Sequence, residues 1–190
     1  GTFAGDRRVA LYQISAMVTL AAAIAAVSAS YGTVATAFSN TVSVDSFGSF
    51  GKILIFAASM ICIAIAPRFF AKGMRAEYPV LILFAALGMG IMVSARDMMT
   101  LYIGLELNSL AAYVLASFMR NDDRSSEAGL KYFVLGALAS GMLLYGISLL
   151  YGFSGSTQFS EVAKALASDV SIGELFGIIF LLSGLAFKIS

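Results

Sequence analysis

The chain has 190 residues, of which 59% are hydrophobic and 12% charged, and its formal net charge is +1. Because an ordinary soluble domain carries about 25% charged residues, this composition indicates an integral membrane protein. The chain has no histidine and a single cysteine, Cys62, which excludes a zinc cluster, a haem ligand set, a Cys/His nucleophile pair and an internal disulfide. The near-zero net charge excludes the basic surface that nucleic acids require. Any redox cofactor is therefore expected in another chain, and no metal site is expected in this one.

Six apolar stretches are long enough to form transmembrane helices, since about 18 residues are needed to cross ~30 Å of hydrocarbon. The alternating ~10-residue strands of a closed barrel are absent from the sequence, so we predict helices. The predicted fold class is all-α, a polytopic transmembrane helix bundle forming one domain over residues 1–190. Because the sequence opens without methionine and its last apolar stretch is unfinished, we expect a fragment of a longer chain. The six stretches cover residues 10–30, 48–67, 78–95, 98–119, 128–151 and 171–190.

Basic residues gather in alternate connections between the predicted helices. By the positive-inside rule, these connections face the cytoplasm of a bacterium or the mitochondrial matrix. The connection 152–170 then lies on the opposite side, and we expect it to hold a short amphipathic helical turn. The basic connections hold Arg7 and Arg8, then Arg68, Lys72 and Arg75, then Arg120 and Arg124. The connections on the opposite side hold fewer basic residues, namely Lys52, Arg96 and Lys164.

Other polar or small residues have structural interpretations. Asp45 precedes the second stretch, where a carboxylate interacts favourably with a helix dipole. The string SARD (94–97) predicts a tight hairpin, with Arg96 and Asp97 in a turn or a surface salt bridge. Small residues spaced for close helix packing predict no chemistry, and they are Gly136, Ala137, Ser140 and Gly141.

Glu106 fits least well with its surroundings, since it lies near the middle of the apolar stretch 98–119. A carboxyl group at that depth costs several kcal/mol unless a partner or a proton neutralises it, and its side chain is too short to reach either surface. One interpretation is a structural carboxyl that fixes helix packing. The other, which we favour, is a titratable group in a proton or ion path. Burial favours the neutral carboxyl group and a nearby lysine favours the charged one, so a lysine that moves can make the carboxyl group bind and release a proton.

Two lysines also lie within apolar stretches. Lys131 lies near the start of the stretch 128–151, where its methylenes either carry the ammonium to the interface or place it opposite Glu106 across the helical hairpin. Lys188 lies about 17 residues into the last stretch. It is either buried beyond the midplane, beside Gly184, or interfacial if the helix ends there. Because burial favours the neutral form of lysine, we predict Glu106, Lys131 and Lys188 as residues of a proton-translocation path.

Four strings in this order resemble subunit N of the proton-pumping NADH:quinone oxidoreductase, an antiporter-like membrane-arm subunit of respiratory complex I. The resemblance covers roughly residues 44–190, and the ordered set is far more specific than any single string. The strings are VDSFGSFGK (44–52), residues 75–118 with LYIGLELNSL (101–110), residues 125–157 with SSEAGLKYF (125–133), and GLAFKIS (184–190).

This resemblance implies an antiporter-like fold in which the chain holds about six helices and ends in a broken helix that is cut short. Glu106 resembles the membrane glutamate of the family, Lys131 the lysine of its LKYF motif and Lys188 the broken-helix lysine. By this resemblance, Glu106 and Lys131 form a charge pair and Lys188 carries the proton.

The resemblance also implies that the chain works as a subunit of a proton-translocating enzyme and holds no cofactor of its own. FMN, iron–sulfur clusters and a quinone are then expected in partner subunits, and the other membrane-arm subunits of complex I and the lipid bilayer are the expected partners. The expected location is the inner membrane of a bacterium or a mitochondrion. Two alternatives stay open, namely a subunit of a multi-subunit Na⁺/H⁺ antiporter or membrane-bound hydrogenase, and a passive membrane scaffold.

Overall fold

The computed structural model describes residues 9–70, 75–168 and 170–189. Arg7, Arg8 and Lys72, which form part of the predicted charge pattern, lie outside these ranges, as does the side chain of Arg68. Within them the chain forms α1 (Val9–Ala29), β1 (Ala35–Ala37), β2 (Val42–Val44), α2 (Ser46–Phe70), α3 (Glu77–Ser94), α4 (Met98–Ala116), α5 (Asp123–Ser154), α6 (Phe159–Ser168) and α7 (Ile172–Ile189).

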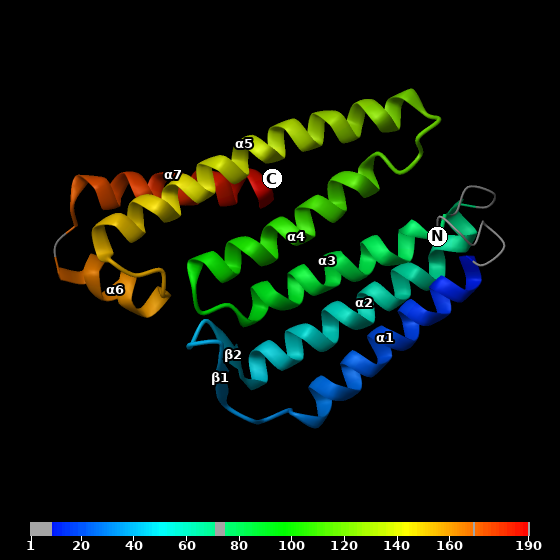
Figure 1. Ribbon diagram of the computed structural model, residues 1–190, viewed down its shortest axis with the longest axis horizontal. Coiled ribbons are helices and arrows are strands. Elements are labelled where there is room, and N and C mark those ends of the chain that lie inside the picture. The colour runs from blue at the N-terminus through cyan, green and yellow to red at the C-terminus, as the bar shows by residue number, and fades with distance from the viewer. Residues whose placement is uncertain (1–8, 71–74, 169, 190) are drawn as a thin grey trace.

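The long helices form a row in which each one packs on its neighbour in the chain, with α7 lying along α5 (Figure 1). One end of the row carries the β hairpin, the α3–α4 turn and α6, and the other carries the α2–α3 and α4–α5 connections (Figure 1). Of the helices that the structure describes, six are long and apolar enough to cross a membrane. The predicted all-α transmembrane bundle is therefore confirmed.

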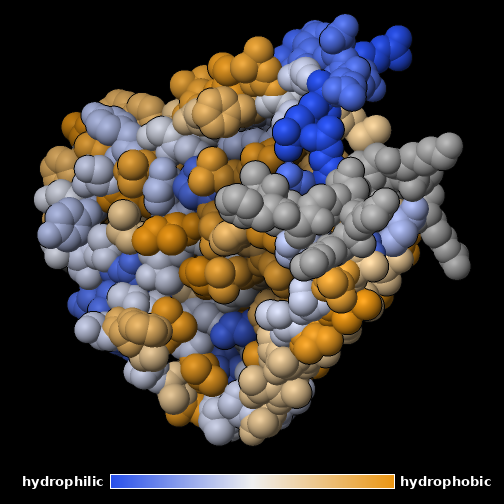
Figure 2. Space-filling view, turned by 45° about the vertical axis from the view of Figure 1, so that its right-hand side comes forward, coloured by the Kyte–Doolittle hydropathy of each residue, from blue (hydrophilic) through white to orange (hydrophobic). Residues whose placement is uncertain are grey.

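The outer surface of this bundle is apolar, as a lipid-facing surface must be. Side chains such as Leu54, Ile103 and Leu138 are each more than half exposed. Hydrophobic residues cover much of the face in Figure 2, while a hydrophilic group gathers at its upper right edge. Since lipid tails are as apolar as leucine, the helices are held together by close packing and hydrogen bonds instead of a hydrophobic driving force.

Two helices begin earlier than the sequence pattern predicts, each for a local reason. α5 begins at Asp123, five residues before the apolar stretch, because the Asp122 carboxylate accepts a hydrogen bond from the Arg124 amide at 2.9 Å. α2 begins after Asp45, whose carboxylate accepts from the Gly48 amide at 2.6 Å. The connection 152–170 contains α6, as predicted, with Val162 buried and Glu161 paired with Lys164 on the exposed side.

Asp97 lies in the α3–α4 turn, as predicted, but the alternative of a surface salt bridge is wrong. Its side chain is buried and caps α4, accepting from the Met99 amide at 2.9 Å, the Thr100 amide at 3.0 Å and the Thr157 hydroxyl. Backbone bonds strengthen the link, since the Met98 amide donates to the Thr157 carbonyl at 2.9 Å. The α3–α4 turn is thereby fixed to the segment that follows α5.

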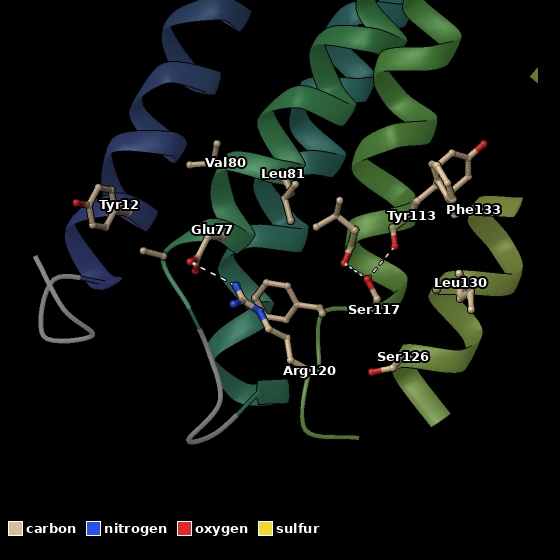
Figure 3. Close-up of a pocket in the computed structure, with 14 residues that line it drawn as sticks. Tyr12, Glu77, Val80, Leu81, Tyr113, Ser117, Arg120, Ser126, Leu130 and Phe133 are labelled. Carbon is tan, nitrogen blue, oxygen red and sulfur yellow. Dashed lines mark hydrogen bonds and ion pairs between the residues drawn. The ribbon is translucent and has the colours of Figure 1, made fainter. Parts of the chain in front are cut away.

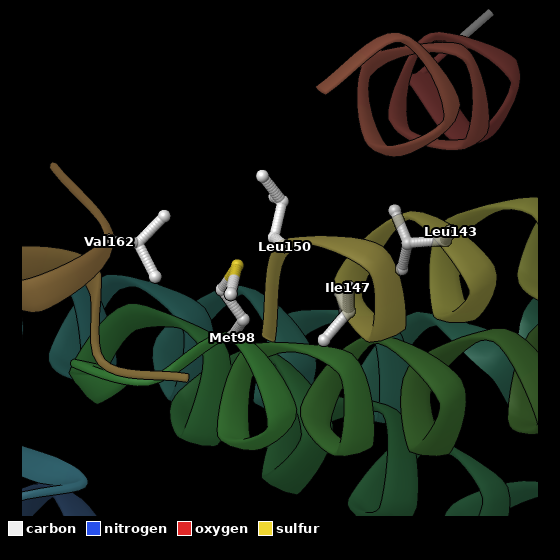
Figure 4. Packing of buried hydrophobic residues seen from close by; sticks show 5 residues of the cluster. All are labelled: Met98, Leu143, Ile147, Leu150 and Val162. Atoms are coloured by element: carbon white, nitrogen blue, oxygen red, sulfur yellow. The ribbon is translucent and has the colours of Figure 1, made fainter. Parts of the chain in front are cut away.

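A buried cluster on the same side fixes α4, α5 and α6 against α7 (Figure 4). α7 approaches α5 closely at Gly184, where an added Cβ would lie 2.9 Å from the Ala139 carbonyl oxygen and from the Leu143 backbone. This close approach places the end of α7, which carries Lys188, inside the bundle. The cluster comprises Met98, Leu143, Ile147, Leu150 and Val162.

Candidate functional site

Three polar side chains line one face of α4 in the middle of the bundle. Ser109 and Tyr113 follow Glu106 by three and seven residues, so the three share a face of a helix with 3.6 residues per turn. The Asp97 cap begins this helix at Met98. The face with Glu106, Ser109 and Tyr113 points toward α5 and α7.

Lys188 of α7 meets this face. Its Nζ lies 2.7 Å from Glu106 Oε1, 3.0 Å from Ser109 Oγ and 3.5 Å from Tyr113 Oη. An ammonium group has three protons, so these three oxygens match its donors. The Lys188 side chain is only 9% exposed and that of Glu106 21%, so the ion pair lies away from the surface of the described bundle.

The third helix of the site is α5, which contributes Ser140. Its hydroxyl donates to Glu106 Oε1 at 2.5 Å, and the residue itself is buried. The prediction that the small residues of α5 only pack is therefore wrong for Ser140. One carboxylate thus joins α4, α5 and α7.

Lys131 does not join this site, so the predicted Glu106–Lys131 pair is wrong. Its Nζ lies 2.5 Å from Glu127 Oε1, one turn earlier on α5, and both side chains are well over half exposed. The geometry of α5 explains the difference. Lys131 and Ser140 are nine residues apart, which is about two and a half turns, or about 13.5 Å along the axis. Lys131 therefore points to the face opposite the one that meets Glu106.

Lys188 is buried, so the interpretation that it is interfacial is wrong. The depth of Glu106 and Lys188 in apolar stretches predicted these two residues but not the hydroxyl groups around them. The signal for Ser109 and Tyr113 was their helical spacing from Glu106, whereas Ser140 had no signal beyond its polarity.

Among the described residues, no cluster of histidine, cysteine, aspartate or glutamate can hold a metal ion.

A pocket of about 830 Å³ lies beside the site, between α1, α3, α4 and α5 (Figure 3). Its walls are mainly apolar, and Tyr113 is the wall residue that also contacts Lys188. At its rim, Arg120 forms a 3.8 Å ion pair with Glu77, and both side chains are exposed. The pocket therefore runs from the end of the bundle that carries the α4–α5 connection to the ring of Tyr113.

Comparison with known proteins shows the family to which the chain belongs. Residues 95–190, which include the whole site, match the family model described as NADH:quinone oxidoreductase/Mrp antiporter, TM. "NADH-quinone oxidoreductase subunit N" of Sphingopyxis alaskensis is 72% identical over 190 residues, covering 100% of this chain and 40% of the relative. The protein of that name from Erythrobacter litoralis is 60% identical, covering 99% of this chain and 40% of the relative.

Solved structures of two membrane complexes contain chains with the same fold. The structure of respiratory complex I from Thermus thermophilus with bound Aureothin contains a chain that superimposes with a TM-score of 0.77 at 29% identity, covering 94% of this chain and 38% of that one. An archaeal membrane-bound sulfane sulfur reductase shares the fold, with a TM-score of 0.70 at 22% identity, 94% coverage of this chain and 38% of that one. The chain spans about 40% of the length of the curated relatives given above. It belongs to the family of NADH:quinone oxidoreductase and Mrp antiporter transmembrane proteins.

Proposed function

We propose that this chain is part of a membrane-arm subunit of a proton-translocating NADH:quinone oxidoreductase, in which Glu106 and Lys188 carry part of the proton path. The observation that supports this most directly is the buried ion pair, 2.7 Å long and surrounded by the hydroxyls of Ser109, Tyr113 and Ser140. Buried ionisable groups are rare within membrane helices and usually mark such paths. The relatives named "NADH-quinone oxidoreductase subunit N" support the assignment to a subunit of that enzyme.

The pair can work as a charge switch. At an effective dielectric constant of about 20, opposite charges 2.7 Å apart attract each other by about 6 kcal/mol. When Lys188 moves away, this attraction is lost, and the carboxylate can bind a proton from one side while the ammonium releases one to the other. When the pair closes again, the proton passes from the carboxyl group to the amine, which restores both charged forms. Each opening and closing can therefore take up and release one proton.

Lys131 has a peripheral role in this proposal. With Glu127 it forms an exposed ion pair near the start of α5, at the end that carries the basic connections. An exposed pair in that position contributes little, whereas the pair of Glu106 and Lys188 is buried. We therefore expect neutralisation of Lys131 to affect proton uptake less than neutralisation of either buried residue.

The remaining parts of the enzyme are assigned to other subunits. FMN, iron–sulfur clusters and the quinone would lie in partner chains, and this chain would transmit a conformational or electrostatic signal from its neighbours in the membrane arm. We propose that it forms one transmembrane domain of a longer subunit. Its location would be a bacterial inner membrane, with the α2–α3 and α4–α5 connections on the cytoplasmic side.

The second candidate is a subunit of a multi-subunit Na⁺/H⁺ antiporter, because the family description includes Mrp antiporters. The test uses membrane vesicles that contain the full-length subunit in its complex, with and without Glu106→Gln. NADH oxidation and proton uptake are measured together after assembly has been verified. Joint loss of both activities supports the proposal. Unchanged activities would leave Glu106 a structural carboxyl, and Na⁺-dependent proton exchange without NADH oxidation would favour the antiporter.

A further inference from the structure

Tyr113 crosses the space between α4 and α5 and contacts the ion pair at the same time. The residue is 5% exposed, and its hydroxyl lies 3.5 Å from Lys188 Nζ. Its ring stands edge-on to the rings of Tyr132 and Phe133, with centroids 4.7 and 5.8 Å apart. These contacts hold the ring in one place, and Figure 3 shows Tyr113 and Phe133 close together beside the pocket.

The position of the tyrosine depends on Gly136 of α5. A Cβ added there would overlap the Tyr113 hydroxyl and lie 2.5 Å from the ring carbon that bears it. The ring is rigid and buried, so it cannot move aside cheaply. Gly136 also lies one turn before Ser140, so a single face of α5 holds the tyrosine hydroxyl and donates a hydrogen bond to Glu106.

Tyr113 also forms the boundary between the ion pair and the pocket. It belongs to the pocket wall, whereas neither Glu106 nor Lys188 does. The pocket reaches the exposed Glu77–Arg120 pair at the end of the bundle. A displacement of the Tyr113 ring would therefore bring the ammonium of Lys188 into contact with a space that leads to the surface.

We propose that Tyr113, held against Gly136, is a positioning residue that keeps the Lys188 ammonium on Glu106 and separates this pair from the pocket. The inference rests on the proposed function, because it specifies how the proton path is closed. The hydroxyl supplies the third acceptor of the ammonium. The ring, together with its two aromatic neighbours, blocks the way from the pocket.

The experiment measures proton uptake per NADH oxidised in vesicles containing the complete complex. Tyr113→Phe keeps the ring and its aromatic contacts but removes the acceptor, so we expect the ratio of protons to NADH to fall about three-fold to ten-fold. Gly136→Ala displaces the ring itself and is expected to lower the ratio of protons to NADH at least as much. Gly141→Ala is the matched control, because an added Cβ at Gly141 meets nothing within 4 Å.

The outcomes separate a positioning role from a structural one. A structural role alone would lower the amount of assembled complex and reduce both activities equally, leaving the ratio of protons to NADH unchanged. If Glu106→Gln abolishes uptake while Tyr113→Phe and Gly136→Ala keep the wild-type ratio, this inference is wrong and the proposed function stands. If Glu106→Gln itself has no effect, the proposed function fails first. Should Gly136→Ala prevent assembly, Tyr113→Phe alone decides the question.

Discussion

Removal of one charge from the Glu106–Lys188 pair is predicted to destabilise the membrane arm more than removal of both. Lys188→Met leaves the Glu106 carboxylate with the Ser140 hydroxyl as its remaining hydrogen-bond donor among the described side chains. An uncompensated buried charge of this kind costs about 3–5 kcal/mol. Glu106→Gln leaves the buried Lys188 ammonium without its counter-charge, but the amide oxygen can still accept its hydrogen bond, so we expect a smaller loss than for Lys188→Met. The double variant leaves no buried charge at this position and should recover most of the loss.

A double-mutant cycle on the assembled complex measures this coupling. Thermal dissociation of the membrane arm is recorded for the wild type, the two single variants and the double variant, and we expect a coupling free energy of about 3 kcal/mol. Lys131→Met serves as the control, since its ion pair is exposed and local to α5. If the losses of the two single variants simply add in the double variant, the side chains are not coupled and the pairing derived from the structure is wrong.

Three further predictions concern residues around the site. Lys131→Met should change stability by less than about 1 kcal/mol, as measured by the same dissociation assay, because exposed pairs contribute little. Asp97→Ala removes the cap of α4 and should cost about 1–2 kcal/mol in that assay while the ratio of protons to NADH stays unchanged. Gly104→Ala should lower the yield of assembled complex, because its Cβ would lie 2.8 Å from the Gly88 carbonyl oxygen, whereas Gly141→Ala should have no effect.

The transmembrane helices could be predicted because length and hydropathy determine them almost alone. The short hairpin of β1 and β2 could not, since its strands are three residues each and exist through their mutual pairing, with Ala35 opposite Val44. The early start of α5 had a local signal in Asp122, an N-cap residue that hydropathy does not register.

The site was predicted in part. Burial of Glu106 and Lys188 follows from their depth in apolar stretches, but their partners depend on how each helix rotates about its axis, which is determined by packing. Lys131 shows the consequence, since it lies on a helix adjacent to Glu106 and yet faces the other way. Ser140 shows the converse, because its small size suggested packing while its hydroxyl binds the carboxylate.

We propose that the Glu106 carboxyl group changes its charge during turnover. This can be tested by infrared difference spectroscopy of the complete complex, recorded between its oxidised and NADH-reduced states. In the wild type we expect a band of a protonated carboxyl group that changes with reduction, and in Glu106→Gln, in a complex that still assembles, this band should be missing. Identical difference spectra for the two proteins would refute the proposal, because the carboxyl group would then keep one charge state throughout.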